Sequence, residues 1–136
     1  MKKYIISAVL LLLLCSSAWS QTISGYLKHI DGTNASRGCV ELQYYNENEK
    51  QWEIKARTCV NVNGYFSFTV NDTGSYYLYG YGAGCTSEYG ENGPFPVSSP
   101  WTYKEIHANR YRLKPYWCLR GCCTETFSPP EENDNE

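Results

Sequence analysis

The sequence predicts an all-β protein: a single β-sandwich domain stapled by disulfides. Three observations lead to this fold class. β-Branched and aromatic residues alternate with polar ones, and no segment has a convincing helical period. Glycine or Asn-Gly turn signals recur roughly every ten residues. An even number of cysteines follows an export signal.

The 136 residues divide into three parts. Residues 1–20 have the basic start, apolar run and small final residues of a secretory signal. The apolar run is shorter than the ~20 residues that span a bilayer, so cleavage is favoured over a membrane anchor. Residues 21–123 would form the sandwich, and residues 124–136 are acidic and typical of a disordered tail. We expect an exported protein, periplasmic or extracellular, with a lipid anchor at Cys15 as the alternative.

The charge distribution argues against two classes of partner. Without Lys2 and Lys3 the chain keeps 10 of its 12 basic residues against 14 acidic ones, a net charge of −4. All of that excess lies in the tail, which has five acids and no base, whereas residues 21–123 have 10 bases and 9 acids. Because no basic field remains on the body, neither nucleic acid nor an anionic membrane is an expected partner.

The turn signals delimit the strands. We expect strands at residues 22–28, 39–46, 52–60, 65–70 and 75–81, with inward-facing positions that include Ile23, Leu27, Phe66, Phe68, Val70, Tyr76 and Leu78. Residues 82–100 are rich in glycine and proline and are expected to be irregular. Residues 101–113 would close the sheet, although the apolar pattern changes face along them, which a bulge near Asn109 would reconcile.

The hairpin formed by residues 39–46 and 52–60 has one register that satisfies several constraints. It pairs Tyr44 with Ile54, Leu42 with Ala56 and Val40 with Thr58 on the apolar side. On the other side it pairs Tyr45 with Glu53, Gln43 with Lys55, Glu41 with Arg57 and Cys39 with Cys59. The sequence therefore predicts a Cys39–Cys59 disulfide, with the strands pinched or bulged to bring the sulfurs together.

Four cysteines remain: Cys85, Cys118, Cys122 and Cys123. They would form two further bridges whose pairing the sequence leaves open, with Cys85 the far partner of one of the other three. Adjacent cysteines strain when bonded to each other, so Cys122 and Cys123 are expected to reach different partners. The alternative is a soft-metal site of Cys118, Cys122 and Cys123, with His107 as a further ligand. Disulfides are favoured because they need only oxidation, and no cofactor or metal is expected.

The order of short motifs resembles the carboxypeptidase regulatory-like domain over about residues 22–82. The motifs are Ser24-Gly25-Tyr26-Leu27, Asp31-Gly32, Gly38-Cys39-Val40-Glu41-Leu42, Asn63-Gly64-Tyr65-Phe66-Ser67-Phe68 and Gly74-Ser75-Tyr76-Tyr77-Leu78. The resemblance implies a single antiparallel, Greek-key, transthyretin-like sandwich of about seven strands. It also implies an accessory or binding module without catalytic residues of its own. The chain departs from the family in its six cysteines, in residues 34–37 and in everything past residue 82.

Aromatic residues are the best candidates for a binding surface. The stripe Tyr77, Tyr79, Tyr81, together with Tyr89, Trp101 and Tyr103, offers flat apolar rings with polar tips, which suit a protein or glycan ligand. The competing interpretation, which the short chain favours, is that the stripe packs under residues 82–100 or against the stapled C-terminal segment. We do not expect an enzyme, because the two histidines are isolated and no hydrolase or phosphate-binding motif occurs.

Overall fold

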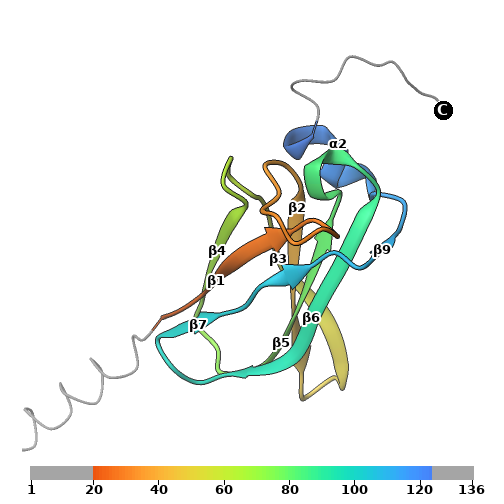
Figure 1. Cartoon of the computed structure of the whole chain (residues 1–136). Coiled ribbons are helices and arrows are strands. Elements are labelled where there is room, and N and C mark those ends of the chain that lie inside the picture. The colour runs from red at the N-terminus through yellow and green to blue at the C-terminus, as the bar shows by residue number, and fades with distance from the viewer. Residues whose placement is uncertain (1–19, 124–136) are drawn as a thin grey trace, which may run out of the picture.

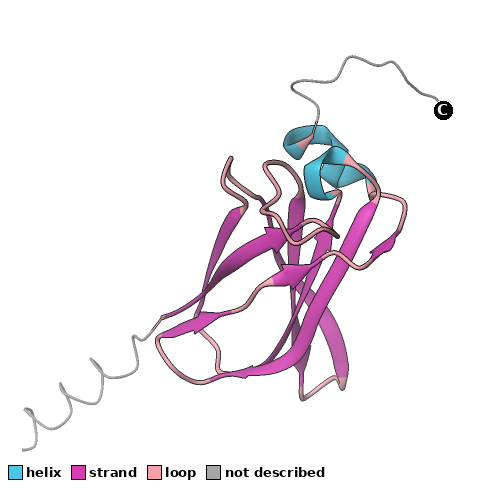
Figure 2. Cartoon of the chain, viewed as in Figure 1, coloured by secondary structure: helices cyan, strands magenta, loops and turns pink. Residues whose placement is uncertain are grey.

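The computed structural model of the protein describes residues 20–123. The expected signal, with Cys15, and the acidic tail therefore lie outside the described residues, apart from Ser20. Within that range nine strands form two sheets that enclose one apolar core, and a short α-helix lies at one end (Figures 1 and 2). The all-β prediction is confirmed. Among the described residues, no helix has the length and apolar character needed to cross a membrane.

The smaller sheet is built around β1 (Gln21–Lys28). β4 (Tyr65–Val70) pairs antiparallel with one edge of β1, whereas β7 (Trp101–Tyr103) and β8 (Ile106–His107) pair parallel with the other. A wholly antiparallel sandwich was therefore the wrong expectation. β7 and β8 reach this sheet from the opposite one rather than through a hairpin, so no tight turn imposes an antiparallel direction on them.

The larger sheet is antiparallel throughout, in the order β3-β2-β5-β6-β9. Its strands are β2 (Cys39–Asn46), β3 (Gln51–Cys59), β5 (Gly74–Tyr81), β6 (Glu88–Val97) and β9 (Arg110–Tyr111). The inward positions predicted from alternation are all buried: Ile23, Leu27, Phe66, Phe68, Val70, Tyr76 and Leu78. The same alternation turns the odd-numbered residues of β5 outward, which is what creates the candidate site.

The expectation of an irregular segment at 82–100 is wrong for most of its length. A 3₁₀ turn, η1 (Ala83–Cys85), precedes the ten-residue strand β6. β9 pairs only with Glu88 and Tyr89, so the rest of β6 is an edge among the described strands. Pro94 and Pro96 lie on that edge, where a missing N–H breaks no ladder. Glycine and proline therefore marked an edge strand rather than a loop.

The segment at 101–113 changes sheets instead of bulging. The Ala108 amide donates to the Lys28 carbonyl in the smaller sheet (3.0 Å), and the next amide, of Asn109, donates to the Tyr89 carbonyl in the larger one (2.9 Å). Two glycines make room for this crossing, because a Cβ on Gly25 would overlap the Lys104 carbonyl and one on Gly90 the His107 carbonyl. The change of apolar face near Asn109 is therefore a change of sheet.

The β2–β3 register is confirmed over its first half. Cys39 faces Cys59, Glu41 faces Arg57 and Leu42 faces Ala56. A bulge between Leu42 and Gln43 then shifts the pairing, so that Tyr44 faces Glu53 and Tyr45 faces Trp52, against prediction. The shift brings the Tyr45 and Trp52 rings into edge contact on the outer face, with centroids 5.2 Å apart. It also turns Ile54 outward, 53% exposed.

The predicted Cys39–Cys59 disulfide is wrong, although the two residues do lie directly opposite each other. A seven-residue helix, α2 (Tyr116–Cys122), lies over them and supplies both partners. Cys39 bonds Cys118 and Cys59 bonds Cys122, with Cα–Cα distances of 5.7 and 5.2 Å. Residues four apart share one face of a helix, so one turn presents two sulfurs to two adjacent strands. Such a helix is too short to be stable alone, which explains why the sequence did not predict it.

Candidate binding face

The outer surface of the larger sheet carries a cluster of rings that we call the aromatic face. It consists of Tyr45, Trp52, Tyr77, Tyr79, Tyr81, Tyr89 and Trp117. Tyr77, Tyr79 and Tyr81 are half-buried on β5, the middle strand of the sheet. Their inward neighbours Tyr76 and Leu78 are fully buried, so the two-residue repeat of the strand separates the face from the core.

The rings nearest the β2–β3 turn are in contact and remain open to solvent. Tyr77 and Tyr79 are stacked, with centroids 4.8 Å apart and an interplanar angle of 13°. The Trp52 ring approaches Tyr77 edge-on at 5.7 Å and is 38% exposed. The sequence analysis missed Trp52 and Tyr45, because the bulge that brings them to this face leaves no signal in an alternating pattern.

A row of alternating charge crosses the sheet through Tyr79. Glu41 on β2 and Glu91 on β6 lie opposite Tyr79 from the two sides. The Arg57 guanidinium pairs with Glu41 (Nε–Oε1 3.2 Å), and Arg110 pairs with Glu91. Glu41 is only 5% exposed, so its carboxylate lies below the surface, and its second oxygen accepts from the Gln43 amide. The Arg57 side chain that pairs with it is 40% exposed. The carboxylates of the face are therefore compensated within the protein.

Glu91 also organises two tyrosines. Its carboxylate accepts hydrogen bonds from the Tyr77 hydroxyl (2.6 Å) and the Tyr89 hydroxyl (2.9 Å). The bond to Glu91 raises the pKa of Tyr77 to about 12, and the bond from Tyr77 is the main cause that lowers the pKa of Glu91. At neutral pH Tyr77 is thus a neutral donor to a carboxylate, and its ring is held in place on the face.

Tyr81 and Tyr89 have a packing role. Tyr89 is fully buried, with the guanidinium groups of Arg110 and Arg112 lying 5.1 and 4.5 Å from its ring centroid. Tyr81 lies 5.2 Å from Tyr89 and contacts the edge of Trp117 on α2 at 5.8 Å. The stapled C-terminal segment therefore covers the Tyr81 end of the stripe, whereas the Tyr77 and Tyr79 end is left open.

The other two candidate residues belong to a different surface. Trp101 and Tyr103 lie on β7 in the smaller sheet and are 77% and 56% exposed. Tyr103 contacts the edge of Tyr26 and donates its hydroxyl to Glu105 (2.7 Å). The six residues predicted to form one site are thus divided between the outer faces of two sheets, because β7 pairs with β1 and not with β6.

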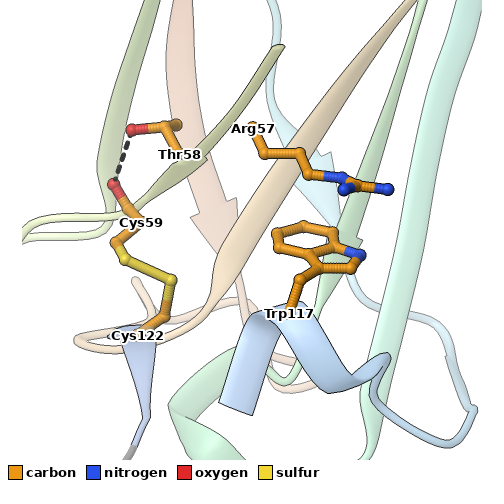
Figure 3. Close-up of a pocket in the computed structure, with 5 residues that line it drawn as sticks. All are labelled: Arg57, Thr58, Cys59, Trp117 and Cys122. Atoms are coloured by element: carbon orange, nitrogen blue, oxygen red, sulfur yellow. Dashed lines mark hydrogen bonds between the residues drawn. A yellow bond between two sulfur atoms is a disulfide. The ribbon is translucent and has the colours of Figure 1, made fainter. Parts of the chain in front are cut away.

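A shallow cavity lies where α2 meets the aromatic face (Figure 3). It has a volume of about 200 Å³ and is lined by Arg57, Thr58, Cys59, Trp117 and Cys122. The Arg57 guanidinium stacks over the Trp117 ring, 4.6 Å from its centroid, while also holding Glu41. Sequence reasoning missed Trp117 and Arg57. The four-residue spacing of Cys118 and Cys122 was the signal that could have placed a helix, and Trp117, here.

The alternative metal site does not form as predicted. Cys118 and Cys122 are consumed in disulfides, so they offer no thiolate. His107 forms a hydrogen bond with Glu105 (Nε2–Oε1 2.8 Å), and His29 forms one with Glu88 (Nδ1–Oε1 3.2 Å). Between residues 20 and 123 there is no group of three or more histidine, cysteine or acidic side chains that could hold a metal ion. Among the cysteines of this described range, Cys85 and Cys123 are the two outside the bridges.

No protein-family model and no curated protein matches the sequence. Solved structures that match this chain in part include an (S)-allantoin synthase, at 12% identity and a TM-score of 0.48 over 67% of this chain. A DUF3823 family protein from Parabacteroides merdae matches at 19% identity and a TM-score of 0.48 over 73% of this chain. The chain spans 40% and 48% of the length of these two proteins.

Proposed function

We propose that the protein is a non-catalytic, exported binding module that engages a protein or glycan at the cell surface or in the periplasm. The single observation that carries this proposal is the stacked Tyr77–Tyr79 pair, which is half-exposed beside Trp52 on the outer face of the larger sheet. The two disulfides support export, because such bonds persist in oxidising compartments.

Of the two ligand classes, a saccharide fits the aromatic face better. β2 and β5 are interior strands whose backbone groups are used within the sheet. A peptide lying across them would lose water from its amides without gaining backbone partners. A sugar ring instead places its apolar C–H face on an aromatic ring and keeps its hydroxyls at the rim. The ion pairs of Glu41 and Glu91 leave little unbalanced charge, which suits a neutral ligand.

The finer fold assignment is also part of the proposal. We infer a Greek-key, transthyretin-like sandwich related to the carboxypeptidase regulatory-like domain. The support is the motif order over residues 22–82, whose aromatic positions Phe66, Phe68 and Tyr76 form the core between the sheets. An accessory role is in keeping with that resemblance.

The test compares two matched double variants by calorimetry. Tyr77→Ala with Tyr79→Ala removes the stacked pair, whereas Trp101→Ala with Tyr103→Ala removes exposed rings from the other sheet. Tyr81 is left intact because it packs against Trp117. The probes are neutral hexasaccharides of glucose, xylose and N-acetylglucosamine, together with a library of unstructured peptides.

We expect at least one saccharide to bind the unaltered protein and the Trp101/Tyr103 variant equally. The Tyr77/Tyr79 variant should lose tenfold or more in affinity, which is about 1.4 kcal/mol. Binding that is unchanged in the Tyr77/Tyr79 variant, or lost only in the Trp101/Tyr103 variant, would refute the aromatic face as the site. Binding of peptides alone would reject the saccharide.

A further inference from the structure

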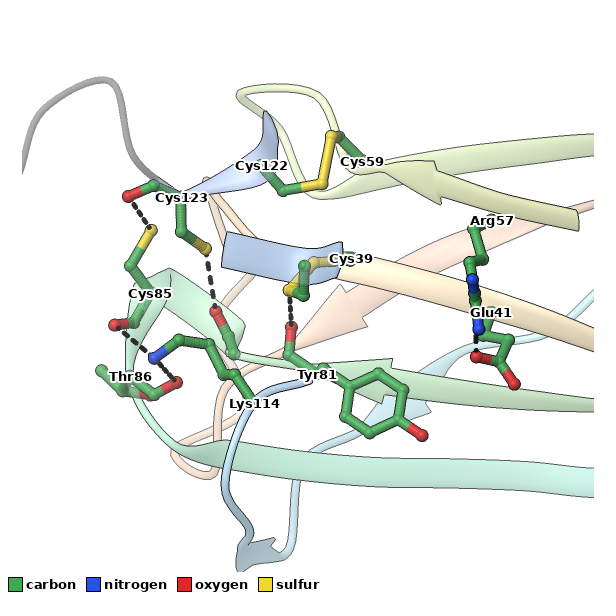
Figure 4. Close-up of a disulfide and its surroundings, with 12 residues drawn as sticks. Cys39, Glu41, Arg57, Cys59, Tyr81, Cys85, Thr86, Lys114, Cys122 and Cys123 are labelled. Atoms are coloured by element: carbon green, nitrogen blue, oxygen red, sulfur yellow. Dashed lines mark hydrogen bonds and ion pairs between the residues drawn. A yellow bond between two sulfur atoms is a disulfide. The ribbon is translucent and has the colours of Figure 1, made fainter. Parts of the chain in front are cut away.

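Two thiols meet on the far side of α2 from the Arg57 cavity. Cys85 ends the η1 turn and Cys123 follows the last residue of α2. The Cys85 thiol donates to the Cys123 carbonyl (3.5 Å), and the Cys123 thiol donates to the Gly82 carbonyl (3.9 Å) (Figure 4). Both thiols line a small cavity of about 130 Å³ with Lys114 and Leu119. The two sulfurs therefore face the same small space.

We propose that Cys85 and Cys123 form a third disulfide in the exported protein. The pairing follows by position as well as by proximity. Cys122 points to Cys59 on the larger sheet, whereas its neighbour Cys123 is turned toward the β5–β6 connection that holds Cys85. A bond between the adjacent residues Cys122 and Cys123 would be strained. It is not needed here, because their side chains point in opposite directions and reach different partners.

The surroundings of the pair determine which of the two sulfurs reacts first with an oxidant. Cys123 is 3% exposed, and burial together with the hydrogen bond between its thiol and that of Cys85 raises its pKa to about 12. Cys85 is half-buried and is the sulfur that an incoming reagent can reach. The Lys114 ammonium donates to the carbonyls of Cys85 and Thr86 (3.3 and 3.1 Å), which fixes the η1 turn beside α2.

The oxidant is a disulfide, either of a thiol oxidoreductase or of a small molecule in the exporting compartment. The Cys85 thiolate attacks one sulfur of that disulfide, whose S–S bond breaks, and the departing thiolate takes up the proton lost by Cys85. The Cys123 sulfur then attacks the Cys85 sulfur of the mixed disulfide and displaces the second thiolate, which takes up the Cys123 proton. Two cysteines are oxidised and one disulfide is reduced to two thiols.

The bond would complete the attachment of α2. Cys118 and Cys122 already tie the helix to β2 and β3. A Cys85–Cys123 bridge would tie its end to the η1 turn, which connects β5 and β6. The helix, which carries Trp117 of the aromatic face, would then be held by three disulfides.

The experiment uses the full chain exported into an oxidising compartment and purified without reductant. It is denatured, treated with N-ethylmaleimide and weighed intact, and then digested for peptide mapping. We expect no alkylation, a mass lower than that of the reduced chain by the six hydrogens of three bridges, and a cross-linked peptide joining Cys85 to Cys123. In the Cys85→Ser variant, Cys123 should take up one alkyl group while the other two bridges persist.

Two alkylated thiols at Cys85 and Cys123 in the unaltered protein would overturn the proposal, as would a cross-linked peptide that joins either residue elsewhere. If Cys85→Ser fails to fold, Cys123→Ser gives the reciprocal result, with one alkyl group on Cys85. Elemental analysis of the same sample covers the remaining case, because a soft metal bound by the two thiols would also contradict the disulfide.

Discussion

The free energy of unfolding of cysteine variants distinguishes the observed pairing, Cys39–Cys118 and Cys59–Cys122, from the Cys39–Cys59 pairing that the strand register suggests. Cys39→Ser with Cys59→Ser removes both observed bridges, whereas Cys59→Ser with Cys122→Ser removes one. When one bridge is intact, the other closes a short loop, since Cys59 lies 20 positions after Cys39 and Cys122 lies four positions after Cys118. A loop of about 25 residues corresponds to about 3.5 kcal/mol of stability.

Loss of both bridges costs more, because the last one closes a loop of 63 or 79 residues. The chain-entropy relation then gives about 8 kcal/mol for the Cys39/Cys59 variant, most of the 5–15 kcal/mol available to a typical domain. Urea denaturation followed by circular dichroism measures both values. The single Cys59→Ser variant loses the same bridge as the Cys59/Cys122 variant and should match it.

A Cys39–Cys59 pairing would reverse the order of the two variants. Cys39→Ser with Cys59→Ser would then remove one bridge and Cys59→Ser with Cys122→Ser would affect two. The reasoning is refuted if the Cys39/Cys59 variant proves as stable as the Cys59/Cys122 variant, or more stable.

Three further predictions concern the crossing segment and the aromatic face. Gly90→Ala should lower the free energy of unfolding by about 1–3 kcal/mol, because the added Cβ meets the His107 carbonyl carbon at 2.7 Å. Urea denaturation measures this change, and Ser67→Ala on the exposed side of β4 is the control. The pKa of Tyr77 is raised to about 12, so the stability that its hydrogen bond contributes is complete below the ordinary pKa of 10.0 and is lost as pH rises through 12. In an ultraviolet titration, the Tyr77→Phe variant should therefore lack one tyrosine that ionises late. An unchanged titration curve would contradict the hydrogen bond to Glu91. The pKa of Glu91 is lowered, so the stability that this carboxylate contributes is present above its ordinary pKa of 4.5 and is lost as pH falls below that value. In the Glu91→Gln variant the free energy of unfolding should therefore fall less steeply at acid pH, and Tyr77 should titrate closer to pH 10.0.

The core was predictable from the sequence because its signal is local. Each strand of a sandwich must bury every second residue, so the alternation of Phe66, Phe68 and Val70 along one short segment already shows which side of the strand faces the core. The opposition of Cys39 and Cys59 was likewise predictable, because one hairpin connects them and its charges fix the register.

The candidate site was only partly predictable. Tyr77 and Tyr79 could be placed on the outer face by alternation, but Trp52 reaches them through a bulge and Trp117 through a helix held by disulfides. Trp101 and Tyr103 were assigned to the same surface because they are near in sequence and similar in kind. They lie on a different surface because β7 pairs with β1 in the smaller sheet, and no single residue of β7 specifies that pairing.

The sequence by itself determined an all-β chain, the buried face of its strands and an even set of cysteines suited to disulfides. Tertiary structure alone decided the partner of each cysteine, the sheet joined by each of β7, β8 and β9, and the tyrosines left open to a ligand. The physical reason is range. Alternation and turn chemistry act between residues a few positions apart, whereas a disulfide such as Cys39–Cys118 depends on where packing brings segments 79 residues apart together.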